Sequence, residues 1–375
     1  MLRNSFFLLL IFFHILLSFI SCSSKQVTVP IEPQSVILEE DKPVITKKPA
    51  EEIISITGVG DIMLGTNFPS EEYLPPDNGK TLLSDTSDFF QKSDIVFGNL
   101  EGSFLNSGKC YKACSDPKKC YAFRMPENYI QHLKKAGFNL ISIANNHVGD
   151  FGLPGREKTA ELLIENEINF AGLDTQPSTT FTKDGIKYGF CAFAPNVGTP
   201  DLRDIDKACE TVRNLSLACD IVIVSFHGGA EGSENRHVTR MDEIFYGENR
   251  GNVYEFSHRV IDAGADVVFG HGPHIARAVE LYKNRFIAYS LGNFCTYARF
   301  NLRGLNGIAP IIKLNVGKDG TFSSGKIIPI IQKYKQGPKH DEDNLAVKEI
   351  IELTLIDFPE TNLIISETGI IDIKN

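Results

Sequence analysis

Residues 139–152 read NLISIANNHVGDFG, an apolar run that ends abruptly in a polar loop. The run covers residues 140–144, and Asn145, Asn146 and His147 follow it directly. A short apolar run bounded by turn residues is typical of a strand in a sheet that is covered on both faces. Ligands of α/β folds bind where such strands end. We therefore expect a site at this outlet; a turn that is merely rich in asparagine is the alternative.

The chain has the composition of an ordinary globular protein. Its 375 residues are enough for one large domain or two. Hydrophobic residues make up 42% and charged residues 23%, as in most soluble domains. The formal net charge is -9 and the pI is about 5.6, so no basic surface is available to displace the counterions of a nucleic acid. Nucleic acid is therefore excluded as a partner.

The first 22 residues have the pattern of an export signal. Arg3 precedes an apolar run over residues 6–20, and small residues follow it. The run is shorter than the roughly 20 residues of a spanning helix, which favours a secretory signal. The sequence Phe19-Ile20-Ser21-Cys22 resembles a bacterial lipobox, which implies lipidation of Cys22, export and anchoring to a membrane of the cell envelope. An ordinary signal peptide or an uncleaved anchor is the alternative.

Residues 23–52 form a different kind of segment. They are polar, contain Pro30, Pro33, Pro43 and Pro49, and show neither helical nor alternating periodicity. This composition predicts a flexible tether. We expect the folded domain to span residues 53–334, and residues 335–375 to form an extension packed on it, with a helix over 346–353 and two short strands.

The cysteines suggest disulfides in an exported chain. Cys110, Cys114 and Cys120 crowd into one loop without a nearby fourth cysteine or histidine. This spacing favours a disulfide-stapled loop over a zinc site. Cys209 and Cys219 either pair with each other or are simply buried.

Strand-like and helix-like segments alternate along the rest of the chain. Asp184-Gly185 predicts a tight hairpin turn, and a second hairpin is expected around residues 317–320. Such alternation predicts a layered α/β sandwich with mixed sheets. The expected strands are 53–59, 95–98, 169–171, 220–226, 266–269 and 286–289, and the expected helices lie within 73–90 and over 126–137, 155–166, 205–218 and 253–263.

Polar groups follow several of these strands, as they follow residue 144. Folding a sheet would bring them together although they are distant in sequence. Carboxylate, imidazole and amide donors of this kind suit one or two divalent ions, which lower the pKa of water and support phosphoryl displacement. His147 could protonate a leaving group and Asp150 could orient it. The set comprises Asp61, Asn99, Glu101, Asn145, Asn146, His147, His227, Glu231, His271, His274 and Asn293. Of these, we expect Asn99, Asn145, Glu231 and Asn293 to line a polar cleft around the metal ligands.

Six short motifs occur in an order that resembles a known family. They are Gly60-Asp61, Gly98-Asn99-Leu100-Glu101, Ala144-Asn145-Asn146-His147, Ser225-Phe226-His227 with Glu231, Gly270-His271-Gly272-Pro273-His274 and Tyr289-Ser290-Leu291-Gly292-Asn293-Phe294. Together they resemble the bacterial capsule-synthesis CapA family, also called the poly-γ-glutamate biosynthesis PgsA family, over residues 53–334. That family is similar to the calcineurin-like metallophosphoesterases.

The resemblance implies a metallophosphatase-like α/β fold, a four-layer α-β-β-α sandwich with two mixed sheets. It implies that Asp61 and His274 bind a first Mn, Fe or Zn ion and that Asn146, His227 and His271 bind a second. It further implies that Glu101 bridges the ions and that His147 is the general acid. Met63 departs from the pattern, because phosphoesterases carry a histidine at that place.

The resemblance implies a role in capsule or poly-γ-glutamate biosynthesis. The active alternative is a metal-dependent hydrolase or transferase acting on an anionic extracellular polymer or on its phosphorylated or amide-linked precursor. The inactive alternative is a subunit that binds the polymer or a membrane synthase. Met63 favours the second, and the intact ligand set favours the first. Four arginines either contact the anionic substrate or are solvated, namely Arg236, Arg240, Arg277 and Arg299.

Overall fold

The structure is a computed structural model that describes residues 53–113 and 121–374. The export signal, Cys22, the tether, Cys114 and Cys120 lie outside these residues, so the corresponding predictions stay predictions. Within the described ranges, no helix is both long and apolar enough to cross a membrane. Cys209 and Cys219 are free thiols, and Cys209 is buried.

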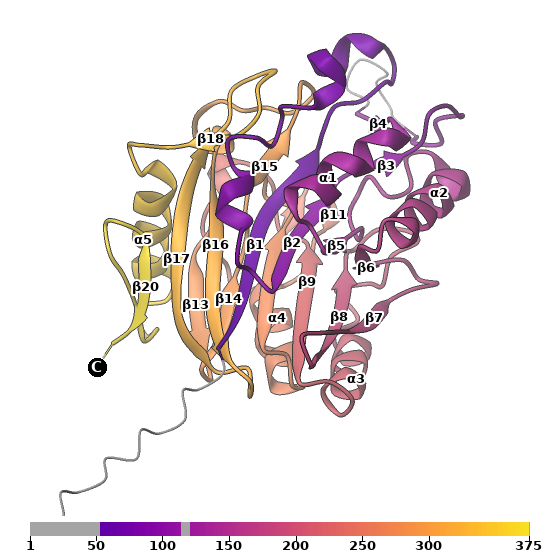
Figure 1. The fold of residues 1–375 in the computed structure, drawn as a ribbon. Helices are drawn as coiled ribbons and strands as arrows, with labels where there is room; N and C mark the ends of the chain where they lie inside the picture. Colours follow the sequence, from indigo (N-terminus) through magenta and orange to yellow (C-terminus); the bar gives the residue numbers. More distant parts are fainter. Residues whose placement is uncertain (1–52, 114–120, 375) are drawn as a thin grey trace, which may run out of the picture. The chain divides into compact units, whose positions relative to one another are not determined.

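The larger sheet is mixed (Figure 1). Its centre is parallel, because β1, β2, β5 and β6 run in the same direction, whereas β16 and β17 form an antiparallel hairpin beside β1. All six residues of β2 are buried, as expected of a strand covered on both faces. The strands are β1 (Ile53–Met63), β2 (Ile95–Leu100), β5 (Leu140–Ser142), β6 (Asn169–Ala171), β15 (Asn293–Thr296), β16 (Ile308–Gly317), β17 (Phe322–Ile331), β18 (Lys339–His340), β19 (Leu363–Ile365) and β20 (Ile370–Ile373).

The smaller sheet is also mixed. Its centre is the parallel group β8, β9, β12 and β14, and antiparallel strands flank it on both sides. The predicted tight hairpin joins β7 and β8, with Asp184 at φ 50° and Gly185 at φ 82°, the conformation that a two-residue turn requires. The strand order is β13 (Val279–Tyr282), β14 (Arg285–Ala288), β12 (Val267–His271), β9 (Ile221–His227), β8 (Ile186–Phe193) and β7 (Ser178–Lys183).

The two sheets pack face to face and helices cover their outer faces. The inter-sheet core contains Phe97 of β2 stacked on Phe269 of β12, with 5.2 Å between ring centroids. Helices α1 (Ile130–Ala136) and α2 (Gly152–Glu165) bury Leu133 and Leu163 against the larger sheet. Helices α3 (Ile205–Ser216) and α4 (Val253–Asp262) pack on the smaller one. These layers confirm the predicted α-β-β-α sandwich.

The residues after 334 pack on this body. Helix α5 (Leu345–Asp357) contributes Val347 and Ile350 to the inter-sheet core, and β20 extends the larger sheet next to β17. The expected helix and two strands are therefore present here.

The helix expected within residues 73–90 was wrong. That segment forms short 3₁₀ helices at Glu71–Tyr73, Pro76–Gly79 and Ser87–Phe90. Pro75 and Pro76 interrupt a helical hydrogen-bond pattern, and Asp77 and Asn78 adopt left-handed φ values of 52° and 57°. Other short elements are β3 (Ser103–Phe104), β4 (Arg124–Met125), β10 (Ile244–Phe245), β11 (Glu248–Asn249) and the 3₁₀ turns Glu127–Tyr129, Ser233–Asn235 and Gly304–Gly307.

Arg277 has a structural role that neither sequence alternative described. Its side chain is fully buried, and its guanidinium donates to both carboxylate oxygens of Glu243 at 2.9 Å and to the Ala230 carbonyl at 3.0 Å. It therefore fastens the loop that follows β9. Arg240 instead pairs with Glu360 on the surface, where both side chains are about half exposed.

Replacing Arg277 with Met should lower the free energy of unfolding by about 3–5 kcal/mol, because Glu243 would stay buried without its counter-charge. Arg240→Ala is the matched control and should cost at most about 1 kcal/mol. Urea unfolding followed by circular dichroism measures both. Equal losses in the two variants would show that the Arg277 pair is no more important than a surface pair.

Candidate metal centre

The predicted donors come from both sheets and meet at the ends of their strands. Asp61 lies near the end of β1, and Glu101 directly follows β2. On the smaller sheet, His227 and His271 end β9 and β12 and are paired in register. Since the parallel strands of each sheet point the same way, their outlets converge.

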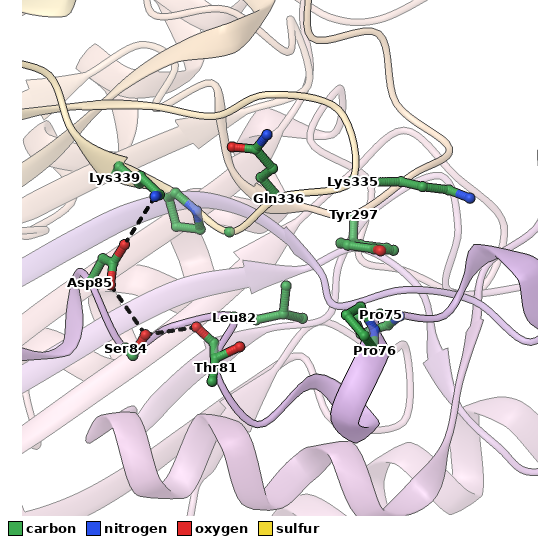
Figure 2. A pocket seen from close by; sticks show the side chains of 12 residues that line it. Pro75, Pro76, Thr81, Leu82, Ser84, Asp85, Tyr297, Lys335, Gln336 and Lys339 are labelled. Carbon is green, nitrogen blue, oxygen red and sulfur yellow. Dashed lines mark hydrogen bonds and ion pairs between the residues drawn. The ribbon is translucent and has the colours of Figure 1, made fainter.

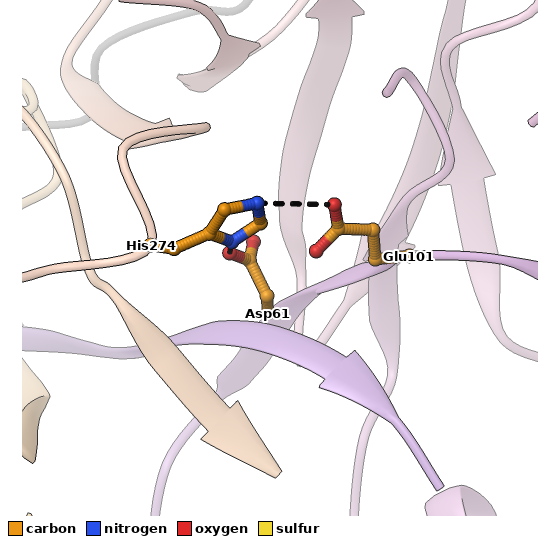
Figure 3. A group of neighbouring side chains, drawn as sticks. All are labelled: Asp61, Glu101 and His274. Atoms are coloured by element: carbon orange, nitrogen blue, oxygen red, sulfur yellow. Dashed lines mark hydrogen bonds and ion pairs between the residues drawn. The ribbon is translucent and has the colours of Figure 1, made fainter. Parts of the chain in front are cut away.

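Asp61, Glu101 and His274 form the centre of the cluster (Figure 3). One potential ligand atom from each of the three lies within 4.8 Å of the others. His274 Nδ1 lies 3.0 Å from Asp61 Oδ2, and His274 Nε2 lies 3.7 Å from Glu101 Oε1. The backbone of His274 has a φ of 58°, a strained conformation that is common at functional sites.

The ionisable groups of this cluster shift one another's pKa values. Burial alone would raise the pKa of Asp61, but His271 and His274 outweigh burial and hold this pKa below its ordinary range. Burial raises the pKa of Glu101 well above its usual value. His274 responds in the opposite way, since the two carboxylates outweigh its burial and raise its pKa to about 10.

Several buried donors have no hydrogen-bond partner in the described part of the chain. They are both carboxylate oxygens of Glu101, both ring nitrogens of His227 and of His271, and Oδ1 of Asn146. His271 Nδ1 approaches Asp61 Oδ1 to 3.2 Å, without forming an aligned hydrogen bond. An unsatisfied buried polar group costs about 1–3 kcal/mol, and more if it is charged. A divalent ion would satisfy such a set, so the residues fit a metal site.

His227 is in the right protonation state for such a site. Burial lowers its pKa well below the usual value, so its ring is neutral near pH 7. A neutral imidazole is the form that binds metal. Its ring centroid lies 6.3 Å from that of His274, so the histidines that follow two neighbouring strands of the smaller sheet lie at one centre.

His147 and Asp150 form a pair beside the centre. His147 Nδ1 lies 2.7 Å from Asp150 Oδ2, and His147 Nε2 lies 3.8 Å from Glu101 Oε1. Burial lowers the pKa of His147 to about 4. The resting ring is therefore neutral, and its Nδ1–H donates to Asp150. Its Nε2 is left on the side of Glu101 with a lone pair that can accept a proton.

Lys112 joins this pair, although no pattern in the sequence indicated it. Its Nζ lies 3.2 Å from Asp150 Oδ1 and 3.1 Å from His147 Nδ1. Because that Nδ1 carries the proton directed at Asp150, the favourable contact of Lys112 is the one with the carboxylate. The contacts of Asp150 with both Lys112 and His147 thus fix the orientation of the imidazole.

Asn99 and Asn145 lie behind the metal donors rather than in the cleft where we expected them. Both are fully buried. Asn99 Nδ2 donates to Asp61 Oδ1 at 2.9 Å, and Asn145 Nδ2 donates to Asn99 Oδ1 at 3.2 Å. These amides therefore orient the carboxylate, as partners of metal ligands commonly do.

A cavity of about 840 Å³ opens over the cluster. The predicted cleft residues Glu231 and Asn293 line it, together with Asn146, His147 and His274. Two buried or half-buried rings form one wall, because Phe123 lies 4.2 Å from His147 and 4.9 Å from Phe300 between ring centroids. The cavity is much larger than a single phosphate, so a bound molecule could extend well beyond the reacting group.

A second cavity lies elsewhere on the domain (Figure 2). It has a volume of about 330 Å³ and lies between Pro75, Leu82, Tyr297 and Lys339. Among the described residues, it shares no lining residue with the cavity over the metal donors. It also contains none of the predicted site residues.

The sequence matches a known protein family over most of this body. The family model for the bacterial capsule synthesis protein PGA_cap matches residues 55–298. The chain belongs to this family. It is 27% identical over 265 residues to the "Capsule biosynthesis protein CapA" of Bacillus anthracis, covering 65% of this chain and 60% of that protein. The predicted membership is therefore confirmed.

Two further relatives of this PGA_cap chain carry related names. The "PGA biosynthesis protein CapA" of Bacillus subtilis (strain 168) is 25% identical over 65% of this chain and 64% of its own. The "Probable polyglutamine synthesis accessory protein Rv0574c" of Mycobacterium tuberculosis (strain ATCC 25618 / H37Rv) is 26% identical over 54% of this chain and 55% of its own. The chain thus spans about three fifths of the length of these relatives.

Solved structures that align with this one include a phosphoesterase and a phosphatase. A calcineurin-like phosphoesterase, YfkN from Bacillus subtilis, aligns with a TM-score of 0.41 and 12% identity, covering 82% of this chain and 98% of that chain. The purple acid phosphatase PPD1 of yellow lupin aligns with a TM-score of 0.37 and 12% identity, covering 80% of this chain and 55% of its own. Similarity at this level does not bear on activity.

Met63 of the PGA_cap chain belongs to the core. It is fully buried in the cluster between the larger sheet and its helices, and its Sδ accepts from the Gly65 backbone N–H at 3.3 Å. This position therefore packs the fold and supplies no imidazole.

Gly60 brings two strands of the PGA_cap domain unusually close together. A Cβ at this position would lie 2.0 Å from the Gly292 carbonyl oxygen and 2.5 Å from that of Leu291. Gly60→Ala should therefore separate β1 from β15, lower the free energy of unfolding by about 1–3 kcal/mol and weaken metal binding by displacing Asp61. Urea unfolding and metal titration measure the two effects.

The matched control is Gly317→Ala, where the nearest atom belongs to the side chain of Asp319, at 2.9 Å. That side chain can move, so stability and metal binding should both stay close to wild type. Unchanged metal affinity in the Gly60 variant would show that Asp61 keeps its place without this close approach.

Proposed function

We propose that this chain is a metal-dependent hydrolase or transferase of capsule or poly-γ-glutamate biosynthesis. Its substrate would be an anionic extracellular polymer or the phosphorylated or amide-linked precursor of one. The observation that carries the proposal is the convergence of buried, unpaired metal donors with the His147–Asp150 pair on one cavity. Family membership supports the biological setting.

The metal ligands would be Asp61, Glu101, Asn146, His227, His271 and His274. Oxygen donors mixed with imidazole suit Mn, Fe or Zn better than Mg or Ca. A bound divalent ion supplies positive charge that polarises the bond under attack and lowers the pKa of water.

The remaining steps belong to the side chains of the site. Asn99 and Asn145 hold Asp61 in its orientation. Asp150 and Lys112 fix the His147 ring. Because the resting ring is neutral, it must take up a proton before it can donate one to a leaving group, and a negatively charged substrate at Nε2 favours that protonation. Phe123 packs against the His147 ring, and Phe300 stacks on Phe123.

The setting that we propose is the cell envelope. An export signal over residues 1–22, lipidation at Cys22 and a tether over residues 23–52 would hold the domain close to a membrane. A polymer or a membrane synthase would then be within reach of the cavity.

The rival proposal is a subunit that binds polymer or a synthase without catalysing a reaction. Met63 favours it, because phosphoesterases carry a histidine at this position. The Met63 thioether lies in the core instead, so Asp61 has only the imidazoles of His271 and His274 beside it. Both proposals predict the same fold, but only the hydrolase proposal predicts turnover of a substrate.

A substrate screen separates them. The full chain, loaded with Mn²⁺, is assayed against phosphomonoesters, phosphodiesters and γ-glutamyl amides, beside Asp61→Asn. Turnover that a chelator abolishes, that Mn²⁺ restores and that the variant lacks would support the hydrolase. Bound metal without turnover on any class, together with retention of poly-γ-glutamate on the immobilised protein, would favour the binding subunit.

A further inference from the structure

Asn293 has a buried oxygen without a hydrogen-bond partner in the described structure. The residue begins β15, is 1% exposed and lines the cavity over the metal donors. Its Oδ1 is buried and unpaired. Its Nδ2 donates to the His274 carbonyl at 3.1 Å and to the Asn306 carbonyl at 3.0 Å.

These contacts fix the orientation of the Asn293 amide. If the amide were flipped, its oxygen would face two carbonyl oxygens, and no hydrogen could lie between them. The nitrogen must therefore face the carbonyls, and the oxygen remains as an acceptor beside the cavity. An acceptor buried in this way, with nothing to accept from, points to a ligand.

The strand register places this oxygen near Asp61. Strand β15 runs parallel to β1, Asp61 is paired with Asn293, and the Asp61 backbone N–H donates to the Gly292 carbonyl at 2.8 Å. Side chains alternate between the faces of a sheet, so paired residues of neighbouring strands lie on the same face. Asn293 therefore projects to the side of the sheet on which Asp61 meets His271 and His274.

The three ligand atoms near Asp61 are fewer than the four or more that a divalent ion takes in proteins. Asp61, Glu101 and His274 offer three ligand atoms close together, and the sulfur of Met63 is occupied by the Gly65 N–H. Amide oxygen is a normal ligand of hard divalent ions. We propose that Asn293 Oδ1 is a further ligand of the ion that Asp61, Glu101 and His274 hold, an assignment that rests on the metal centre of the proposed function.

Asn293 could also act only through the backbone of His274. Asn306 Nδ2 donates to the same His274 carbonyl, also at 3.1 Å, so two amides hold this strained residue. Asn306 is a built-in control, because its loss removes one such hydrogen bond and leaves the Asn293 oxygen in place. Asn293→Asp is the second control, since it keeps an oxygen donor and loses the amide hydrogens.

The test is a Mn²⁺ titration of the full chain, followed by electron paramagnetic resonance of free Mn²⁺. Asn293→Ala should weaken binding by about 100-fold or more, whereas Asn306→Ala should weaken it by no more than about 10-fold, the lower end for partners of ligands. Asn293→Asp keeps the oxygen ligand but turns a second oxygen toward the two carbonyls, so it should weaken binding less than Asn293→Ala does. Equal weakening in all three variants would overturn the assignment, because it would show that only the hold on His274 matters.

A direct readout uses protein labelled with ¹³C at the asparagine side-chain carbonyls. Wild type loaded with Mn²⁺ should show electron–nuclear couplings from Asn146 and Asn293, and Asn293→Ala should lose one of them. Couplings unchanged by that variant would overturn the assignment even if activity fell. A wild-type chain that binds no Mn²⁺ would instead refute the metal centre itself, so the two failures are distinguishable.

Discussion

Purified without chelator, the full chain should carry one or two Mn, Fe or Zn ions, and the Asn146→Ala, His271→Ala double variant should carry almost none. The two replaced side chains contribute an orphaned amide oxygen and an orphaned imidazole. Each lies at a strand outlet of a different sheet, so the variant removes donors from both sides of the centre. Metal content by mass spectrometry of the desalted protein gives the answer.

Removing bound metal should also lower the thermal stability of the wild type. At a free metal concentration 100 times the dissociation constant, binding contributes about 2.7 kcal/mol to the free energy of unfolding. Chelation removes this contribution and leaves Glu101, His227 and His271 buried without partners. The double variant should show almost no further loss with chelator.

The matched control for metal content is His132→Ala. This histidine lies on α1, and its Nε2 contacts the Asn78 carbonyl at 2.7 Å, away from the metal donors. It should leave metal content unchanged. Circular dichroism of all variants separates lost ligands from lost fold. A folded wild type that takes up no metal, even when Mn²⁺, Fe²⁺ or Zn²⁺ is supplied, would refute the metal centre and the hydrolase together.

Much of the fold was predictable because its strands are buried on both faces. Such strands appear in the sequence as continuous apolar runs, and β2, β9 and β12 all do. Their ends are equally visible, since polar residues break the runs at His227 and His271. Parallel packing then brings the ends together, which explains why a metal site could be proposed from residues far apart in sequence.

Elements without such patterns were missed or misread. Strand β15 is only four residues long and follows a turn. The motif around Asn293 could therefore be interpreted only as the end of the strand expected at 286–289, and not as the start of another strand. The segment over 73–90 contains apolar residues at helical spacing, but its prolines and left-handed residues prevent an α-helix. In both segments, the individual residues determined the structure, and the hydrophobic periodicity did not.

Side chains that act through tertiary contacts were not predictable. Lys112 lies in a polar loop, and nothing near it in sequence indicates contact with Asp150. The role of Arg277 depends on Glu243, which is 34 residues away. Phe123 could have been suspected only as an apolar residue in the cysteine-rich loop. Each contact exists only after both sheets have assembled.

Replacing His147 with Asn should leave the metal in place and lower kcat by about 10²–10⁴-fold on any substrate that the wild type turns over. The reason lies in the geometry, because His147 Nε2 lies 3.8 Å from Glu101 and the ring is fixed by Asp150 and Lys112. An asparagine fits the space but cannot transfer a proton. Steady-state kinetics and metal analysis of the same preparation measure both effects.

The chain offers a closely matched control in His237. Its Nδ1 lies 2.7 Å from Asp357 Oδ1, the same contact that joins His147 to Asp150, yet His237 is about half exposed and absent from the cavity lining. His237→Asn should therefore change neither kcat nor metal content. A His147 variant with unchanged kcat would exclude proton transfer by this ring, and one that loses its metal would make His147 a ligand instead. Retained metal with a large fall in kcat separates the role of His147 from that of the metal ligands, because it assigns to one side chain a step that metal binding alone cannot supply.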